Sequence, residues 1–129
     1  MFVCPDCGNE LSVRKCNTDG GSGTLEVDWC SFCGGTFFDR LEINRFPYRE
    51  ALKLGKLLPH VSASTLSGTN ECPKCHVTME RLTGEAIPHE VHAKKCGNCD
   101  GTWFAVVELE KFKKAQEAKI SYYKVWKIP

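Results

Sequence analysis

Residues 30–38 read CSFCGGTFF, and residues 96–104 read CGNCDGTWF. The two stretches agree at both cysteines, at a Gly-Thr pair and at the two aromatic positions that follow it. Further along, residues 41–43 read LEI where residues 107–109 read VEL. Agreement over so many positions indicates two copies of one folding unit.

Each copy also begins with a cysteine pair, CPDC at residues 4–7 and CPKC at residues 72–75. The two pairs of a copy are 22 residues apart in the first and 20 residues apart in the second. Structural zinc takes four soft ligands in a tetrahedron, and two facing C-x2-C turns supply them. The sequence therefore predicts two metal sites, one with Cys4, Cys7, Cys30 and Cys33 and the other with Cys72, Cys75, Cys96 and Cys99.

Two Zn²⁺ ions are the expected cofactors, because four thiolates fill each shell and leave no open position for catalysis. Iron is the alternative, since CPxC turns followed by glycine also suit rubredoxin-like electron carriers. We expect His76 to take the place that Gly8 has in the first copy, and His89 and His92 to be exposed on a strand. Cys16 has no counterpart in the repeat, and its role stays open.

The elements expected in each copy are three short antiparallel strands followed by helices. Apolar side chains alternate with polar ones in residues 25–29 (LEVDW) and again in residues 90–94 (EVHAK), which predicts half-buried strands. Helical spacing predicts helices over residues 48–58 and 106–119. The fold class is therefore a small, metal-bound, β-rich α+β protein with two rubredoxin-like zinc ribbons.

The predicted organisation has a first ribbon with its trailing helix at residues 1–58 and a second ribbon with a C-terminal helix and tail at residues 71–129. Between them, residues 59–70 (PHVSASTLSGTN) have the composition of a linker. Whether the two ribbons pack together stays open at this point.

Composition limits the classes of function. The chain has 129 residues, 42% of them hydrophobic and 26% charged, which is typical of soluble globular proteins. It contains no apolar run of the roughly 18 residues that a membrane span needs, and its first residues lack the features of an export signal. We therefore expect a cytoplasmic protein without membrane contact. A net charge of +1 argues against broad coating of DNA.

Each copy resembles a TFIIB-type zinc ribbon, the transcription factor zinc finger. The resemblance lies in the four cysteine pairs, in Gly35 and Gly101, and in the aromatic residues and Glu-Leu-like pairs that follow them. Copy one has Phe37 where that family has Trp, and copy two has Ala105 where it has Asp. We interpret Asp39 and Glu42 as a helix cap and not as a catalytic pair. The resemblance implies a ribbon fold and a role in transcription, frequently through protein contacts.

The C-terminal segment is the one basic and aromatic stretch in the sequence. One interpretation is a solvated helix face followed by a last strand that docks on the ribbon. The other is a surface for protein or nucleic acid. The candidate binding residues are Lys111, Lys113, Lys114, Lys119, Tyr122, Tyr123, Lys124, Trp126 and Lys127.

Taken together, these patterns predict a non-enzymatic interaction module that contacts a protein partner in a transcription-related or regulatory assembly. Nucleic-acid binding through the C-terminal segment and a rubredoxin-like iron electron carrier are the alternatives. The sequence shows no nucleophile paired with a base and no phosphate-binding glycine loop, so we expect no catalytic residues and no small-molecule substrate.

Overall fold

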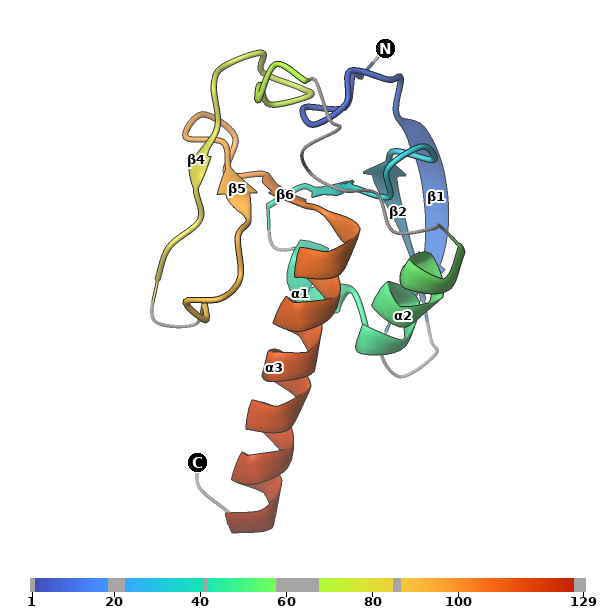
Figure 1. Ribbon diagram of the computed structural model, residues 1–129. Coiled ribbons are helices and arrows are strands. Elements are labelled where there is room, and N and C mark those ends of the chain that lie inside the picture. Colours follow the sequence, from blue (N-terminus) through green and yellow to red (C-terminus); the bar gives the residue numbers. More distant parts are fainter. Residues whose placement is uncertain (1, 19–22, 41, 58–67, 85–86, 127–129) are drawn as a thin grey trace.

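The computed structural model describes residues 2–18, 23–40, 42–57, 68–84 and 87–126 (Figure 1). Its strands are β1 (Ser12–Asn17), β2 (Thr24–Trp29), β3 (Thr36–Phe38), β4 (Glu80–Arg81), β5 (Lys94–Lys95) and β6 (Thr102–Phe104). Its helices are α1 (Glu42–Arg45), α2 (Tyr48–Leu57) and α3 (Val106–Trp126). No helix in the described part of the chain is long and apolar enough to cross a membrane.

The two copies form a single antiparallel sheet. Its six strands run in the order β1-β2-β3-β6-β5-β4, so each copy contributes three neighbouring strands, as predicted. The copies join where β3 pairs with β6, in a register that places Phe37 opposite Trp103. Phe37 and Trp103, which occupy corresponding positions in the two copies, therefore face each other across this seam, which lies at the centre of the sheet (Figure 1). The two ribbons pack together through backbone hydrogen bonds.

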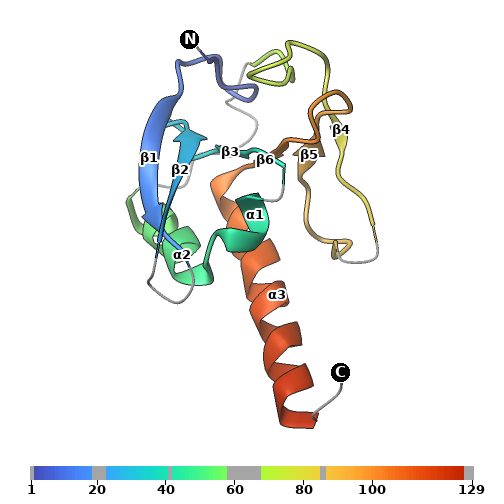
Figure 2. The same cartoon turned by 180° about the vertical axis from the view of Figure 1, so that it is seen from behind.

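The two faces of the sheet pack against different parts of the protein. Along β3 and β6 successive side chains point to opposite faces, so Phe38 and Phe104 pack with the helices while Phe37 and Trp103 pack with the cysteines. Figure 2 shows the helices gathered on one side of the sheet and the cysteine turns on the other. All four aromatic side chains are buried and belong to the core.

A row of aromatic rings crosses the seam on the helix face. Phe38 contacts Phe46 with ring centroids 5.0 Å apart and Phe104 with centroids 6.0 Å apart. Phe104 in turn contacts Phe112 at 5.3 Å. Because Phe46 and Phe112 occupy corresponding positions 66 residues apart in the repeat, the local twofold symmetry extends from the sheet into the helical layer.

Two glycines permit the close approach on the cysteine face. A Cβ atom on Gly35 would lie 2.1 Å from Cζ2 of Trp103, and one on Gly101 would lie 2.3 Å from Cζ of Phe37. The glycine of each copy thus makes room for the aromatic ring of the other. Because each ring occupies the space beside the glycine of the other copy, both copies need a glycine before the Thr-aromatic pair.

The second strand expected in copy two is shorter than predicted. Val91 and Ala93 are buried as their alternation indicated, but β5 comprises only Lys94–Lys95. The residues before it form turns, in which Ile87 donates to the Gly84 carbonyl and Val91 to the Pro88 carbonyl. Pro88 has no N–H for a sheet ladder, so the strand cannot extend back through it. His89 and His92 are exposed, as expected, but lie outside any strand.

The start of α2 agrees with the predicted helix, whereas α3 is longer than predicted. α2 begins at Tyr48 as expected, and before α1 the N–H of Asp39 donates to Oε1 of Glu42 at 2.8 Å, which is one half of the expected cap. α3, however, continues to Trp126, so the expected last strand after residue 119 is wrong. Residues 59–67, which make up most of the predicted linker, lie outside the described residues, and the domain boundaries remain a prediction.

Asp6 connects the first cysteine turn of copy one to the sheet of copy two. Its carboxylate accepts a hydrogen bond from Nε1 of Trp103 at 2.8 Å and one from Nζ of Lys94 at 3.0 Å. The indole N–H belongs to a side chain that is 1% exposed, so an alternative partner from solvent is out of reach. A buried donor without an acceptor is costly.

Replacing Asp6 with alanine is therefore expected to destabilise the metal-loaded protein by about 1–3 kcal/mol. The Lys95→Ala variant is the matched control, because it breaks only the exposed pair between Lys95 and Asp100. We expect that control to stay within about 0.5 kcal/mol of the parent. Urea unfolding followed by tryptophan fluorescence compares the two, and equal stabilities would contradict the role given to Asp6.

Candidate metal centres

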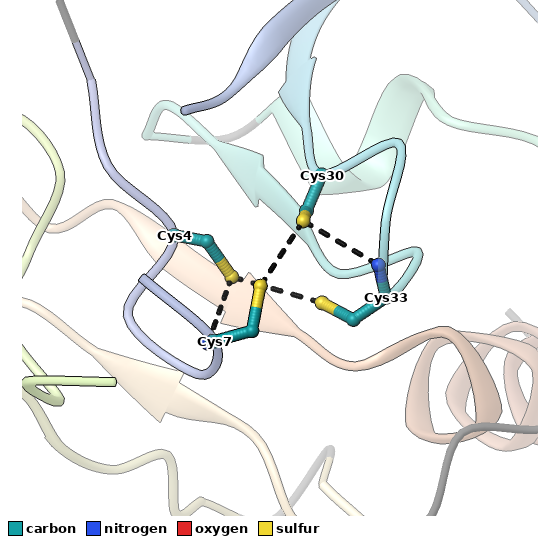
Figure 3. Close-up of side chains that lie close together, drawn as sticks. All are labelled: Cys4, Cys7, Cys30 and Cys33. Atoms are coloured by element: carbon teal, nitrogen blue, oxygen red, sulfur yellow. Dashed lines mark hydrogen bonds between the residues drawn. The ribbon is translucent and has the colours of Figure 1, made fainter. Parts of the chain in front are cut away.

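The first predicted site is assembled from two turns of copy one. Cys4 and Cys7 come from the turn before β1, and Cys30 and Cys33 from the turn between β2 and β3 (Figure 3). The Sγ atoms of Cys4 and Cys33 are 3.7 Å apart, and those of Cys7 and Cys30 are 3.4 Å apart. All four sulfur atoms lie within 4.8 Å of one another. The structure thus brings together the four residues that the spacing singled out.

The second site repeats this arrangement in copy two. Cys72, Cys75, Cys96 and Cys99 form a group with the same mutual separation limit of 4.8 Å, and the Sγ atoms of Cys72 and Cys99 are 3.8 Å apart. Within the part of the chain that the structure describes, these two clusters are the only groups of three or more His, Cys, Asp or Glu side chains that could hold a metal ion.

The sulfur spacing fits a metal ion better than a disulfide. A disulfide needs sulfur atoms about 2.05 Å apart, and all the described cysteines are free thiols. A tetrahedral shell with zinc–sulfur bonds of about 2.3 Å has edges of about 3.8 Å. The closest sulfur pairs, at 3.4–3.8 Å, approach that edge length. Each cluster is thus able to hold one metal ion, with four cysteine ligands.

The backbone of each turn prepares its cysteines for this role. Gly8 and Gly34 have φ angles of 80° and 83°, and the corresponding residues His76 and Asp100 have φ angles of 59° and 60°. This left-handed residue closes each turn and lets backbone N–H groups reach the sulfur atoms, as Cys7 does toward Cys4 at 3.4 Å. His76 is exposed at this position and stands outside the cluster, as the sequence predicted.

Two asparagines support the clusters, and the sequence analysis did not identify them. Nδ2 of Asn9 donates to Sγ of Cys7 at 3.1 Å, and Nδ2 of Asn98 donates to Sγ of Cys75 at 3.2 Å. In each copy the recipient is a half-buried cysteine. Such donors stabilise negative charge on a thiolate. Because Asn9 and Asn98 occupy different positions in the repeat, comparison of the two copies could not reveal them.

Crowding and burial hold several thiols in their protonated form. The hydrogen bond shared with Cys33, together with burial, raises the pKa of Cys4 well above its ordinary range. Burial raises the pKa of Cys30 to about 11 and that of Cys99 to about 12. For Cys96 burial opposes ionisation, but backbone N–H groups of Cys99 and Asn98 lower its pKa to about 7. The clusters thus need a cation before they can carry four thiolates.

Metal binding is therefore expected to release protons at neutral pH, since an ion binds thiolates and the thiols of Cys30 and Cys99 are protonated there. Protons compete with the ion, so affinity should weaken by at least about tenfold for each pH unit lowered below neutrality. Calorimetric titration in two buffers with different heats of ionisation counts the protons. A binding heat that is the same in both buffers would contradict the expectation.

The predicted basic and aromatic surface is only partly as expected. Lys114 is exposed, but Lys111 pairs with Glu108 at 3.4 Å, and Lys113 is 2% exposed and donates to Gln116 at 2.8 Å. Lys113 is therefore not on an open basic face. Five further candidates lie on α3 but their side chains are outside the described part, namely Lys119, Tyr122, Tyr123, Lys124 and Trp126. Lys127 lies outside the described residues altogether.

Comparison with known proteins bears on the second copy. A family model described as a transcription factor zinc-finger, the TFIIB zinc ribbon, matches residues 71–115. A search of the curated proteins and one of the solved structures found no match. The matched range contains all four cysteines of the second cluster, and zinc is the metal that this family implies. A zinc ribbon is a structural, typically non-catalytic domain.

The first copy completes the arrangement. Its cysteine turns, its three strands and its aromatic pair correspond in order and position to those of the matched range. Residues 71–115 therefore match a TFIIB-type zinc ribbon, and the first four-cysteine cluster, near the N-terminus, indicates a tandem arrangement of two metal-binding units.

Proposed function

We propose that this chain is a non-enzymatic interaction module. Its two Cys4 sites hold structural zinc, and its surface contacts a protein partner in a transcription-related or regulatory assembly. The match of residues 71–115 to a transcription factor zinc finger supports the setting. The use of cysteine thiols as metal ligands suits a reducing compartment such as the cytoplasm.

A structural role for the metal follows from the ligand sets. Each cluster offers four thiols to one ion, and a catalytic zinc keeps one position for water or substrate. Thiolate tetrahedra also accept iron, as in rubredoxin-like carriers. Metal analysis of the purified protein separates the two, because a zinc-loaded chain is colourless and an iron-loaded one absorbs visible light. We expect two zinc ions per chain.

The observation that supports a protein partner is the distribution of exposed apolar and basic side chains. Val13 on β1 is 66% exposed and Phe32, at the tip of a cysteine turn, is 64% exposed. On α3, by contrast, Lys113 is buried and Lys111 is paired. Exposed apolar and aromatic side chains offer contacts to a protein, whereas nucleic-acid binding depends on phosphate-binding cations.

The test is to purify the tagged, metal-loaded protein from its native lysate, with and without nuclease. We expect one or more proteins to remain bound after nuclease treatment and to be lost from the Phe32→Gln variant. Val107→Gln is the matched control, because Val107 is also exposed, at 45%, but lies on α3. If everything departs with nuclease, the proposal is wrong, and nucleic-acid binding through the C-terminal segment takes its place.

A further inference from the structure

A groove of about 700 Å³ lies on the helix face of copy two. Phe104 and Phe112 form its floor, and Ile43 of α1 forms part of one wall. Leu82 and Ile87, from the segment between β4 and β5, form part of another. These last three side chains are only partly buried, although they pack against the main core. The groove therefore presents an apolar surface that the described part of the chain does not cover.

The internal symmetry shows what kind of structure fits there. Residues that correspond in the two copies after the second cysteine pair differ by 66 in number, so Phe104, Phe112 and Ile43 of the groove correspond to Phe38, Phe46 and Leu109. Those three residues are fully buried in the core cluster that also holds Ala51 and Leu54 of α2, whereas Ile43 in the groove is only partly buried. The groove is thus the symmetry-related counterpart of the site that α2 fills.

The two sites differ because the chain takes different paths after β3 and β6. In copy one, α1 ends at Arg45, and the chain turns at Pro47 and returns as α2, which packs against α3. In copy two, α3 continues without a break to Trp126 and runs away from the sheet (Figure 2). No described helix therefore returns to cover β4 and β5. A two-to-three-turn helix of the length of α2, ten residues, matches the counterpart site.

The charged side chains around the groove indicate the charge that a bound partner should carry. Arg40 is exposed at the edge and makes no ion pair with any described residue. Lys95 and Asp100 also line the groove, but they already pair with each other at 3.4 Å. The lining therefore carries a surplus positive charge. A second copy of α2 suits it poorly, because that helix contains Arg49, Lys53 and Lys56 against the single acid Glu50.

We propose that this groove binds an acidic amphipathic helix of a partner protein, with apolar side chains against Ile43, Leu82 and Ile87 and a carboxylate on Arg40. An amphipathic helix in an apolar groove is a recurrent mode of protein recognition. The proposal rests on the proposed function as an interaction module and adds to it a second contact surface, on the helix face, and the chemistry of the partner that this surface fits.

The first test uses a library of helical peptides and the metal-loaded full chain. The library keeps the apolar spacing of Ala51 and Leu54 in α2 and varies the outward positions between Glu and Lys. We expect selection to enrich Glu, and nuclear magnetic resonance titration to show shifts at Ile43 and Leu82. No binder, enrichment of Lys, or shifts confined to another surface would each overturn the proposal.

Matched variants then test the position of the groove. Ala115 lines it from α3, and Glu117 is exposed on the opposite side of the same helix, outside the groove lining. We expect Ala115→Arg to weaken peptide binding by about tenfold or more and Glu117→Arg to leave it within about twofold. Arg40→Glu is the second variant, and we expect it to weaken acidic peptides at least about tenfold. Two bound metal ions per chain confirm that each variant is folded.

The lysate experiment separates this proposal from the proposed function. If Ala115→Arg loses the nuclease-resistant partner and Glu117→Arg keeps it, the groove is a contact surface for that partner. If both variants keep the partner, the chain is an interaction module, but the groove proposal is wrong.

Discussion

Removing the metal ions is expected to unfold both ribbons together. The cluster of buried residues on the cysteine face consists of Leu11, Phe37, Met79 and Trp103 with five of the eight cysteine ligands themselves. That cluster spans the seam, so the two sites support one shared core. A half of the chain is too small to bury enough apolar surface alone. Structural zinc contributes about 10–16 kcal/mol to the folding of small domains, more than such a fold retains without it.

The measurement is circular dichroism and tryptophan fluorescence of the chain before and after dialysis against a strong chelator. We expect loss of the native signals and their return when zinc is added back. Cys30→Ser should lose the first ion and, through the seam, weaken the second site. Cys16→Ala is the matched control, because Cys16 is buried in the other core cluster and belongs to neither metal site. Unchanged spectra after complete metal removal would contradict the expectation.

Adding a methyl group at the seam is expected to have the second largest effect. In Gly35→Ala the new Cβ would lie 2.1 Å from the Trp103 ring, and in Gly101→Ala it would lie 2.3 Å from the Phe37 ring. Neither glycine has a left-handed backbone, so the effect comes from the clash alone. Both rings are buried and can move only by displacing the metal turns around them. We expect a loss of about 2–4 kcal/mol for each variant.

Gly97→Ala is the control for these two variants. Gly97 lies in a cysteine turn of copy two, is exposed, and a Cβ there would meet nothing within 4 Å. We expect its stability to stay within about 0.5 kcal/mol of the parent protein. Thermal unfolding of the zinc-loaded proteins compares all three. If Gly35→Ala and Gly101→Ala are as stable as Gly97→Ala, the close packing across the seam does not hold.

The metal ligands can be predicted from the sequence because the C-x2-C pattern is local and occurs in both copies. A C-x2-C turn needs only a few residues to bring two sulfur atoms together, and the second copy repeats the evidence of the first. The second strand of copy one and the start of α2 were predictable for the same reason, since alternation and helical spacing are short-range patterns.

The seam could not be predicted, because nothing in a repeat says whether its copies pair through an edge strand or stay apart. The clue was the glycine before the Thr-aromatic pair, whose partner is a ring in the other copy. Lys113 was misjudged for a different reason. It follows Leu109 and Phe112 on the buried side of α3, so helical spacing places it at the core face in spite of its charge.

The pairing of β3 with β6 has a consequence for how the fold depends on the amount of protein present. Two separate ribbons would meet along this seam only at concentrations comparable to their dissociation constant. On one chain, the segment between them supplies an effective concentration on the order of millimolar, whatever the abundance of the protein. The two halves therefore behave like a symmetric dimer that does not dissociate on dilution. Outside the seam, the surfaces of the two halves can differ without disturbing the contact between them.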